Sequence, residues 1–413
     1  MFLRKKNTGR RFDKTKKRKR LVVGAVGMLL AAGLGFCSAL VGVTAGQLPD
    51  ELTVVTSETA RLATLLPTCV ECHADADSKV ADASAKLFGL IRLKTVHVNF
   101  VPHTKVLLGG TLFGVRMYSD GVMVVGLSDF NSAGRSANPA RDAGIAVGDV
   151  IQAVNGKAVY TNNAFSRLVE TADGDIELKL LHSDGTTRQV TLKPLYSDGD
   201  GCLKTGMWVR DSAAGIGTLT YIDPVHGTFG GLGHGICDSD TQTIVPIHGG
   251  DIVAAELADV KRGVKGTAGE IRGFLGTEKL GSISANTICG TFGSYTGTRP
   301  EGQEYEVAMK QEIKVGKAQV LCTVEPSGKP KLYDININKI NYNGSEPTRN
   351  MIITVTDPEL LRKTGGIVQG MSGSPIIQGG KFVGAVTHVF VNDPTCGYAI
   401  FAENMLKKST LSR

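Results

Sequence analysis

A short segment near the C-terminus, residues 365–377, constrains the fold of this chain most strongly. Apolar, β-forming residues stand on both sides of a turn of small residues that reads Gly-Met-Ser-Gly-Ser-Pro. The glycines at positions 370 and 373 let the backbone bend sharply and let another group approach it without a Cβ in the way. We therefore expect two strands here, joined by a bend from which the hydroxyl of Ser372 projects.

A serine in such a bend is suited to nucleophilic catalysis. Its hydroxyl is a weak nucleophile, so it needs a base to take its proton and donors to hold the oxyanion that forms. The segment resembles the nucleophile loop of chymotrypsin-like serine peptidases, and this implies an oxyanion hole made by the amides of Gly370 and Ser372. Ser374 is a second candidate nucleophile, but Pro375 beside it has no amide to offer. A plain turn between two buried strands would have the same composition.

Three histidines are candidates for the base. His234 follows an apolar run and stands between two glycines, which admit a partner close to its ring. His226 lies in an Asp-Pro-x-His-Gly turn, where solvent exposure is expected, and His248 is the nearest rival. For each of them, a purely structural histidine is the alternative.

The orienting carboxylate is less sharply defined. Asp357 ends a β-type run just before a proline, fifteen residues ahead of Ser372. Asp-Pro is also an ordinary turn or helix-start signal. On chemistry alone, Asp357 is therefore not preferred over Asp238 or Asp251.

The positive charge of the chain is concentrated at its beginning. The whole chain carries +7, whereas residues 1–20 hold eleven Lys or Arg and one acidic residue, about +10. The difference leaves about −3 for the remaining residues. This distribution does not favour nucleic-acid binding.

Residues 21–46 form an uncharged run rich in Leu, Val, Ala and Gly. As a helix the run would be about 39 Å long, enough to span a bilayer. Its basic flank predicts a cytoplasmic N-terminus and an exoplasmic location for the rest of the chain. A cleaved signal peptide is the alternative, although the run is longer than a usual signal core. We interpret residues 47–95 as a tether.

Residues 96–195 show short strands with regular turn signals, and their segment 140–159 resembles the middle of bacterial PDZ domains. It contains a short helix closed by glycine, a Gly-Asp turn, a buried strand and an Asn-Gly hairpin turn. Residues 163–171 predict an amphipathic helix with Phe165, Leu168 and Val169 facing inward.

The PDZ resemblance implies binding of an extended C-terminal or internal peptide at a sheet edge. A glycine-rich stretch at the start of the domain provides the candidate binding residues, although it would also suit a simple strand connection. These residues are Gly109, Gly110, Leu112, Phe113 and Gly114.

From residue 201 to residue 413 the chain consists of short apolar runs separated by glycine-marked turns, which predicts a barrel-like or sandwich domain. Two of its motifs, together with the order of anchor, PDZ domain and β-rich domain, resemble the stage IV sporulation protein B family of serine peptidases. The first motif is Leu-Gly-His-Gly-Ile at 232–236. The second runs from Thr-Asp-Pro-Glu-Leu-Leu to Gly-Met-Ser-Gly-Ser-Pro-Ile at 356–376.

This resemblance implies a mainly β chain with an N-terminal transmembrane helix, a PDZ domain and a chymotrypsin-like β-barrel-type serine peptidase domain. It assigns the nucleophile to Ser372, the base to His234 and the orienting carboxylate to Asp357. Two features depart from ordinary chymotrypsin-like enzymes. Met371 stands where these enzymes carry Asp or Asn, and Asp357 lies unusually close to the serine in sequence.

The resemblance also implies a role in endospore formation. The protein would be a single-pass, membrane-anchored serine endopeptidase in the forespore intermembrane space, acting there as an intercompartmental signal. It would cleave itself, releasing its soluble part, and would cleave a membrane regulatory protein of a membrane-embedded metalloprotease complex. Processing of a pro-sigma factor would follow. A non-catalytic PDZ adaptor at the membrane surface is the alternative.

The eight cysteines suggest no cofactor. Residues 69–73 read Cys-Val-Glu-Cys-His, which is the spacing that attaches a c-type haem. The surrounding sequence does not predict a helical haem domain, so a local disulfide or free thiols fit better. We find no convincing spacing for a metal site, and serine catalysis needs no metal.

Overall fold

The computed structural model describes residues 80–101, 103–299 and 302–410, together with short stretches at 28, 32, 35–36, 38–46, 48, 50–55, 61–62 and 68–71. The chain divides into two compact units, Met1–Val101 and Pro102–Arg413. Much of the predicted anchor at 21–46 lies outside the described residues. Within the part that is described, no helix is both long and apolar enough to cross a membrane.

The first unit contains a five-stranded sheet with the order β1-β5-β4-β3-β2. Its hydrophobic core includes Leu52, Val96 and Val98, all fully buried. Of the predicted Cys-x-x-Cys-His motif, Cys69 lies on β3, whereas Cys72 and His73 lie outside the described residues. The strands are β1 (Glu51–Val55), β2 (Arg61–Leu62), β3 (Thr68–Glu71), β4 (Val80–Leu87) and β5 (Ile91–Val101).

The first part of the second unit has the PDZ elements that the sequence predicts. The predicted hairpin forms between β10 and β11, with Asn155 and Gly156 at positive φ (+50° and +76°) as its turn requires. The predicted helix is α3, which Thr161 caps and which buries Phe165 and Val169. The elements are β8 (Phe130–Ser132), β9 (Arg135–Ala137), α2 (Pro139–Asp142), β10 (Val150–Val154), β11 (Lys157–Ala158), α3 (Asn162–Glu170), β12 (Ile176–Leu181), β13 (Thr187–Leu192), β14 (Leu195–Tyr196) and β15 (Leu203–Lys204).

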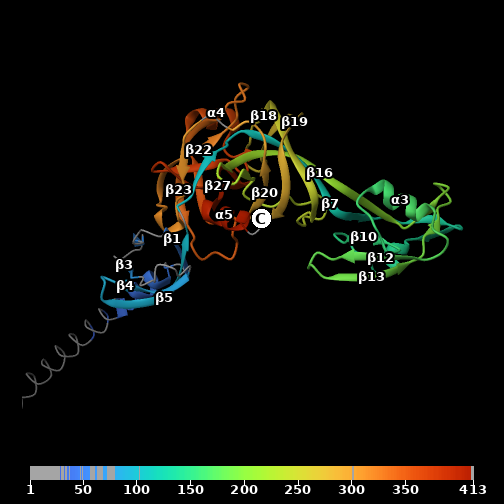
Figure 1. Ribbon diagram of the computed structural model, residues 1–413, viewed down its shortest axis with the longest axis horizontal. Helices are drawn as coiled ribbons and strands as arrows, with labels where there is room; N and C mark the ends of the chain where they lie inside the picture. Colours follow the sequence, from blue (N-terminus) through green and yellow to red (C-terminus); the bar gives the residue numbers. More distant parts are fainter. Residues whose placement is uncertain are drawn as a thin grey trace, which may run out of the picture. The chain divides into compact units, whose positions relative to one another are not determined.

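Two long antiparallel strands, β7 (Leu112–Leu127) and β16 (Met207–Asp223), belong to both parts of the second unit (Figure 1). At one end they contribute to the core around α3, and at the other end to a second hydrophobic core that includes Phe113, Leu219 and Ile252. Two strands therefore continue from the predicted PDZ domain into the predicted peptidase domain, so a linker is not the only connection between them.

The remainder of the second unit combines a larger sheet, in which the pairing of β16 with β7 closes a ring of six strands, with a separate closed barrel. The sheet continues from β7 and β16 through β6 (Lys105–Leu108), β17 (Thr228–Gly231), β18 (Ile247–Lys261), β19 (Gly269–Thr287), β20 (Gly290–Tyr295) and β21 (Glu304–Glu306). The closed barrel consists of β22 (Gly316–Cys322), β23 (Lys331–Ile340), β24 (Met351–Val355), β28 (Asp393–Phe401), β27 (Lys381–Phe390) and β26 (Pro375–Gln378). The remaining elements are η1 (Lys310–Glu312), α4 (Pro358–Thr364), β25 (Val368–Gln369) and α5 (Ala402–Thr410).

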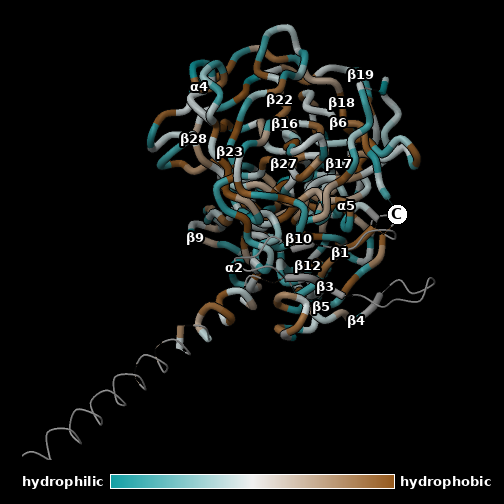
Figure 2. The backbone as a smooth tube through the Cα atoms, turned by 90° about the vertical axis from the view of Figure 1, so that its left-hand side faces the viewer, coloured by the Kyte–Doolittle hydropathy of each residue, from teal (hydrophilic) through white to brown (hydrophobic). Residues whose placement is uncertain are grey.

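The barrel strands alternate buried and more exposed positions, as in β24, where Met351, Ile353 and Val355 face inward. Hydrophobic and hydrophilic positions accordingly alternate along much of the tube in Figure 2. The predicted mainly β fold class is confirmed. Strand β25 joins sheet to barrel by pairing with β19, and the loop after it carries Ser372.

Candidate active site

The loop around Ser372 connects β25 to β26 and is held by the neighbouring strands β16 and β27. The amide of Thr218 donates to the Ser372 carbonyl at 3.1 Å, and the Thr218 hydroxyl donates to the Gly370 carbonyl at 2.8 Å. On the other side, the Gly373 amide donates to the carbonyl of Val386 at 2.8 Å. The nucleophile loop is therefore tied to both the sheet and the barrel.

Glycine is required at position 373 for two reasons. Its φ is +94°, in the region that favours glycine. In addition, a Cβ at this position would lie 2.2 Å from the Thr218 carbonyl oxygen and 2.5 Å from the Leu232 amide nitrogen. The predicted sharp bend is confirmed, and its close approach to β16 explains the glycine.

Ser372 and His234 line one cavity of about 720 Å³. His234 comes from the segment after β17, on the sheet side, whereas Ser372 precedes the barrel strand β26. The structure thus brings together two residues that are 138 positions apart in the sequence. The other lining residues are Val115, Ala213, Ala214, Gly215, Ile216, Leu232, Gly235, Ile236, Cys237, Gln242, Ile244, Ile288, Glu346, Thr348, Arg349, Gln369, Gly370 and His388.

The imidazole of His234 is poised as a neutral base. Its Nδ1 lies 2.9 Å from the carbonyl oxygen of Gly235. Because a carbonyl can only accept, Nδ1 carries the proton and Nε2 keeps its lone pair. Burial lowers the pKa of His234 below 6.5, and the hydrogen bond to Gly235 only partly opposes this shift. The ring is therefore neutral at pH 7 and able to accept a proton.

A second histidine, His388 on β27, lies beside the first. The centroids of the two rings are 5.1 Å apart, with 36° between their planes. Partial burial lowers the pKa of His388 to about 4, and the neighbouring His234 and Arg349 add to the shift. The sequence analysis missed His388, because it stands within an ordinary strand pattern. Its only signal was a polar ring in an otherwise apolar run.

The hydroxyl of Ser372 does not point to the base in this conformation. Its Oγ donates to the carbonyl oxygen of Thr387 at 2.8 Å. Within the described residues, the amides of Gly370 and Ser372 donate no hydrogen bond, so both remain available to an oxyanion. The two amides predicted to hold the oxyanion thus make no other hydrogen bond, while the predicted hydrogen bond between Ser372 and His234 is not made.

Asp357 lies away from this cavity. It is the N-cap of α4, and its Oδ1 accepts from the amides of Glu359 at 2.8 Å and Leu360 at 3.1 Å. Its other oxygen accepts from the amide of Asp334 at 3.4 Å. The described structure therefore does not bring Asp357 to His234, and among the described carboxylates none bonds to that imidazole.

The rival histidines also lie elsewhere. His226 is paired with Asp223 at 2.6 Å, and His248 stacks on Tyr160 with 4.1 Å between ring centroids. Ser374, the rival nucleophile, is completely buried. None of these three residues lines the cavity.

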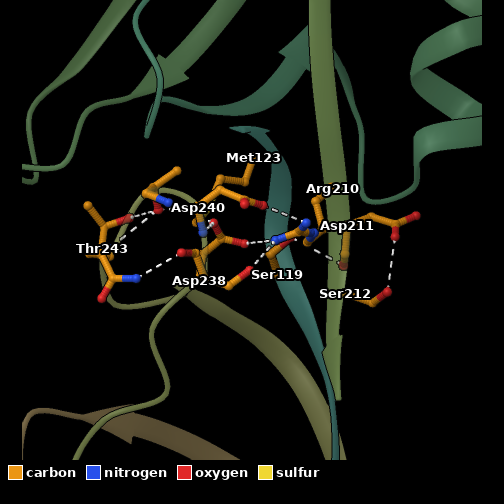
Figure 3. A network of polar contacts seen from close by, with 11 residues as sticks. Ser119, Met123, Arg210, Asp211, Ser212, Asp238, Asp240 and Thr243 are labelled. Carbon is orange, nitrogen blue, oxygen red and sulfur yellow. Dashed lines mark hydrogen bonds and ion pairs between the residues drawn. The ribbon is translucent and has the colours of Figure 1, made fainter. Parts of the chain in front are cut away.

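The rival carboxylates have ion-pair partners of their own. Asp251 pairs with Lys279 at 2.6 Å and does not line the cavity. Asp238 pairs with Arg210 of β16, which also binds Asp240 at 2.7 Å (Figure 3). Arg210 thereby fastens the loop 237–245, three of whose residues line the cavity, to the strand that carries Thr218.

The five residues predicted to bind a PDZ ligand are not in a peptide groove, so this prediction is wrong. In β7, Phe113 pairs with Gly217 on one side and with Ala254 on the other, which leaves no edge for another strand. Gly114 is likewise paired on both sides. Leu112 is buried in the barrel core, while the amides of Gly109 and Gly110 donate to β16.

A second cavity, of about 330 Å³, lies where a PDZ groove would be expected. Phe165 and Val169 of α3 line one side, and residues 207–209 of β16 line another. Residues 207–210 pair with β7 alone, so in the described structure their second edge is open. Sequence reasoning missed this edge, because it follows the PDZ-like segment instead of preceding it.

The described part of the chain contains no group of three or more His, Cys, Asp or Glu residues arranged to hold a metal ion. Besides Cys237, Glu346 and Arg349, the cavity presents a serine, two histidines and backbone amides. Such a combination suits attack on a carbonyl carbon.

Comparisons with known proteins agree with this chemistry. Residues 201–406 match the family model described as SpoIVB peptidase S55, and residues 128–197 match the Tricorn protease PDZ domain. The chain thus contains a serine peptidase domain preceded by a PDZ domain. Residues 201–406 belong to the SpoIVB peptidase S55 family, as the motifs around His234 and Ser372 indicate.

Similarity to solved structures is limited. The HtrA-type protease AlgW, solved with a decapeptide, is 11% identical, with a TM-score of 0.29 over 49% of this chain and 54% of that one. The inactive form of the Rv3671c protease is 14% identical, with a TM-score of 0.27 over 48% of this chain and 83% of that one. The match thus spans about half the length of the AlgW chain. Among curated proteins, none matches the sequence significantly.

Proposed function

We propose that the protein is a serine endopeptidase in which Ser372 is the nucleophile and His234 is the general base. The observation that carries this proposal is that both residues open on one cavity, with His234 held neutral and with the Gly370 and Ser372 amides unused. Membership of residues 201–406 in a serine peptidase family supports it.

In the proposed reaction, the Ser372 hydroxyl rotates from the Thr387 carbonyl toward Nε2 of His234. His234 takes the proton as Oγ attacks the scissile carbonyl carbon, and the two amides hold the resulting oxyanion. The imidazolium then donates the proton to the leaving amine. A water molecule, activated by the same nitrogen, hydrolyses the acyl-enzyme and frees Ser372.

The third triad position is a proposal from the family resemblance alone. Asp357 would have to leave the N-terminus of α4 to reach His234. In the described conformation, the Gly235 carbonyl accepts the hydrogen bond from Nδ1 of His234 and thereby fixes the tautomer, while Asp357 caps α4.

The test compares the full-length protein with its Ser372→Ala variant. Labelling by a fluorophosphonate probe, followed by mass spectrometry, reports the reactive serine and any self-cleavage. We expect both to occur only in the wild type. Equal labelling and self-cleavage of the two proteins would make Ser374 the nucleophile. Absence of both signals in the wild type would refute the peptidase and favour a PDZ adaptor, which the open edge of β16 beside α3 supports.

We further propose the cellular role that the family resemblance implies. The protein would be anchored in the membrane with its catalytic domain exoplasmic, and would cleave itself and a membrane regulator of a membrane-embedded metalloprotease. The basic segment followed by an apolar run supports the anchor. In a spore-forming host, replacing the gene by the Ser372→Ala form should block processing of the pro-sigma factor. Unimpaired processing would contradict this role.

A peptide ligand of the PDZ domain is proposed to add a strand to residues 207–210 of β16 beside α3. This location replaces the one predicted around Gly109. The Val169→Glu variant should weaken peptide binding at this groove, whereas Phe113 variants should affect folding only.

A further inference from the structure

Two large aliphatic side chains are exposed inside the catalytic cavity. Ile244 is 40% exposed and Ile288 is 43% exposed, and both line the cavity with Ser372 and His234. Ile236, half-buried, lies on the same lining. Large apolar side chains that stay exposed in a concave site, instead of in the core, indicate a surface that a ligand covers.

Hydrogen bonds hold the loop that carries Ile244 in place close to His234. The side-chain amide of Asn286 donates to the carbonyls of Ile236 and Val245 at 2.9 and 3.0 Å, and its oxygen accepts from the Ile236 amide at 2.8 Å. These bonds clamp both ends of the loop that carries Ile244. The Asp238–Arg210 pair fastens the same loop to β16 (Figure 3).

Ile244 and the turn that carries Ile288 also adjoin the glycine that follows the base. A Cβ placed on Gly235 would lie 2.7 Å from the Thr287 carbonyl oxygen and 3.4 Å from Cδ1 of Ile244. The turn at 287–288 and the side chain of Ile244 therefore meet at Gly235. The aliphatic surface that we call the isoleucine wall, made of Ile236, Ile244 and Ile288, thus lies beside the catalytic histidine.

The same cavity offers an open backbone edge. Residues 213–216 of β16 pair with β7 on one side. On the other side, within the described residues, they have no strand partner, and Ala214 and Gly215 are exposed. An extended peptide could pair with this edge. Two residues further along β16, Thr218 holds the nucleophile loop.

We infer that the substrate is an extended peptide segment with an aliphatic side chain close to the scissile bond, packed against the isoleucine wall while its backbone pairs with residues 213–216. This inference rests on the proposed peptidase function and names its substrate class. The wall itself carries no charged group. The charged residues of the cavity lining, Glu346 and Arg349, come from the barrel side.

The experiment uses full-length wild type and the Ile244→Ser and Ile288→Ser variants on a peptide library prepared from a digested proteome. Mass spectrometry of the products gives the residue preference on each side of the cut. We expect the wild type to favour Val, Ile or Leu at one position close to the cut, and each variant to lose this preference. For a peptide with that residue, kcat/KM should fall roughly tenfold or more.

Phe274→Ser is the matched control, because Phe274 is 70% exposed on β19 and does not line the cavity. A second variant, Ile288→Asp, should shift the preference toward Lys or Arg at the same position. Fluorophosphonate labelling of Ser372 checks that each variant has an assembled site. If the variants are labelled but their cleavage profile is unchanged, the inferred substrate preference is wrong, while the proposed peptidase stands. If the wild type is not labelled, the proposed peptidase itself is wrong.

Discussion

The hydroxyl of Ser372 donates a 2.8 Å hydrogen bond to the backbone carbonyl of Thr387, the residue next to His388 on β27. The Ser372 hydroxyl is thus directed to the barrel strand and not to His234, although both residues line one cavity. The proposed reaction requires this hydroxyl to turn toward His234.

Replacing Ser372 and Ser374 one at a time should show which of the two serines is the nucleophile. Ser372→Ala should lower kcat/KM for a peptide by at least about 10³-fold, because removal of a nucleophile leaves only binding and the oxyanion hole. Ser374→Ala should retain activity within about tenfold, since Ser374 is buried and its hydroxyl faces that of Thr218 at 3.5 Å. Peptide cleavage measured under identical conditions decides this, and the reverse order of effects would make Ser374 the nucleophile.

Adding a methyl group at Gly373 should damage the fold as well as the site. Gly373→Ala forces a Cβ to within 2.2 Å of the Thr218 carbonyl oxygen at a φ of +94°. We expect the free energy of unfolding to fall by about 2–4 kcal/mol. Gly185→Ala is the control, because its φ of +84° is similar while no atom lies within 4 Å. That variant should lose about 1 kcal/mol. Equal losses in urea unfolding would show that the close approach to β16 is unimportant.

Two replacements of Asp357 separate its capping role from a catalytic one. Asp357→Ala removes the acceptor for the Glu359 and Leu360 amides and should cost about 1 kcal/mol of stability. Asp357→Asn keeps a good N-cap, so its stability should stay within about 0.5 kcal/mol of the wild type. Thermal or urea unfolding measures both variants.

Activity of the Asp357→Asn variant then reports on the triad. A variant that is folded but inactive would indicate that Asp357 reaches His234 in another conformation, as the family resemblance implies. Retained activity would leave Ser372 and His234 acting without it. An Asn variant as unstable as the Ala variant would contradict the cap.

The pH dependence of kcat/KM should follow His234. The reaction needs the neutral imidazole, and burial lowers its pKa below 6.5. Activity should therefore persist as the pH falls past 6.5 and should decline only on reaching the lower pKa. A peptide assay between pH 4 and 8 checks this, and an acid limb at or above pH 6.5 would contradict a buried, neutral base.

Stability should decline over a related pH range because burial lowers the pKa of His388 as well as that of His234. The unfolded histidine binds a proton below about pH 6.5, whereas the folded one does so only near its pKa of about 4. The unfolded state therefore binds more protons between these values, and stability falls as the pH is lowered from 6.5 to 4. His388→Gln should reduce this slope and leave the part that is due to His234, as measured by urea unfolding at a series of pH values. An unchanged slope would show that His388 does not contribute to the pH dependence.

Features that depend on neighbours in sequence could be predicted from the sequence. The bend at Gly370–Gly373, the hairpin at Asn155–Gly156 and the helix ending near Glu170 all appear as expected, because turn chemistry and helical periodicity act over a few residues. The choice of His234 and Ser372 came from two motifs, and the cavity brings the two together.

What only the tertiary structure decided is which distant strands and side chains meet. Phe113 looked like part of an open edge, yet β16 and β18 pair with both sides of its strand. Asp357 looked like a triad member, yet its carboxylate is used by amides of its own helix. His388 carries no motif, but strand β27 brings it beside His234. Pairing between strands far apart in sequence sets these contacts, and a local residue pattern does not say which distant strands become neighbours.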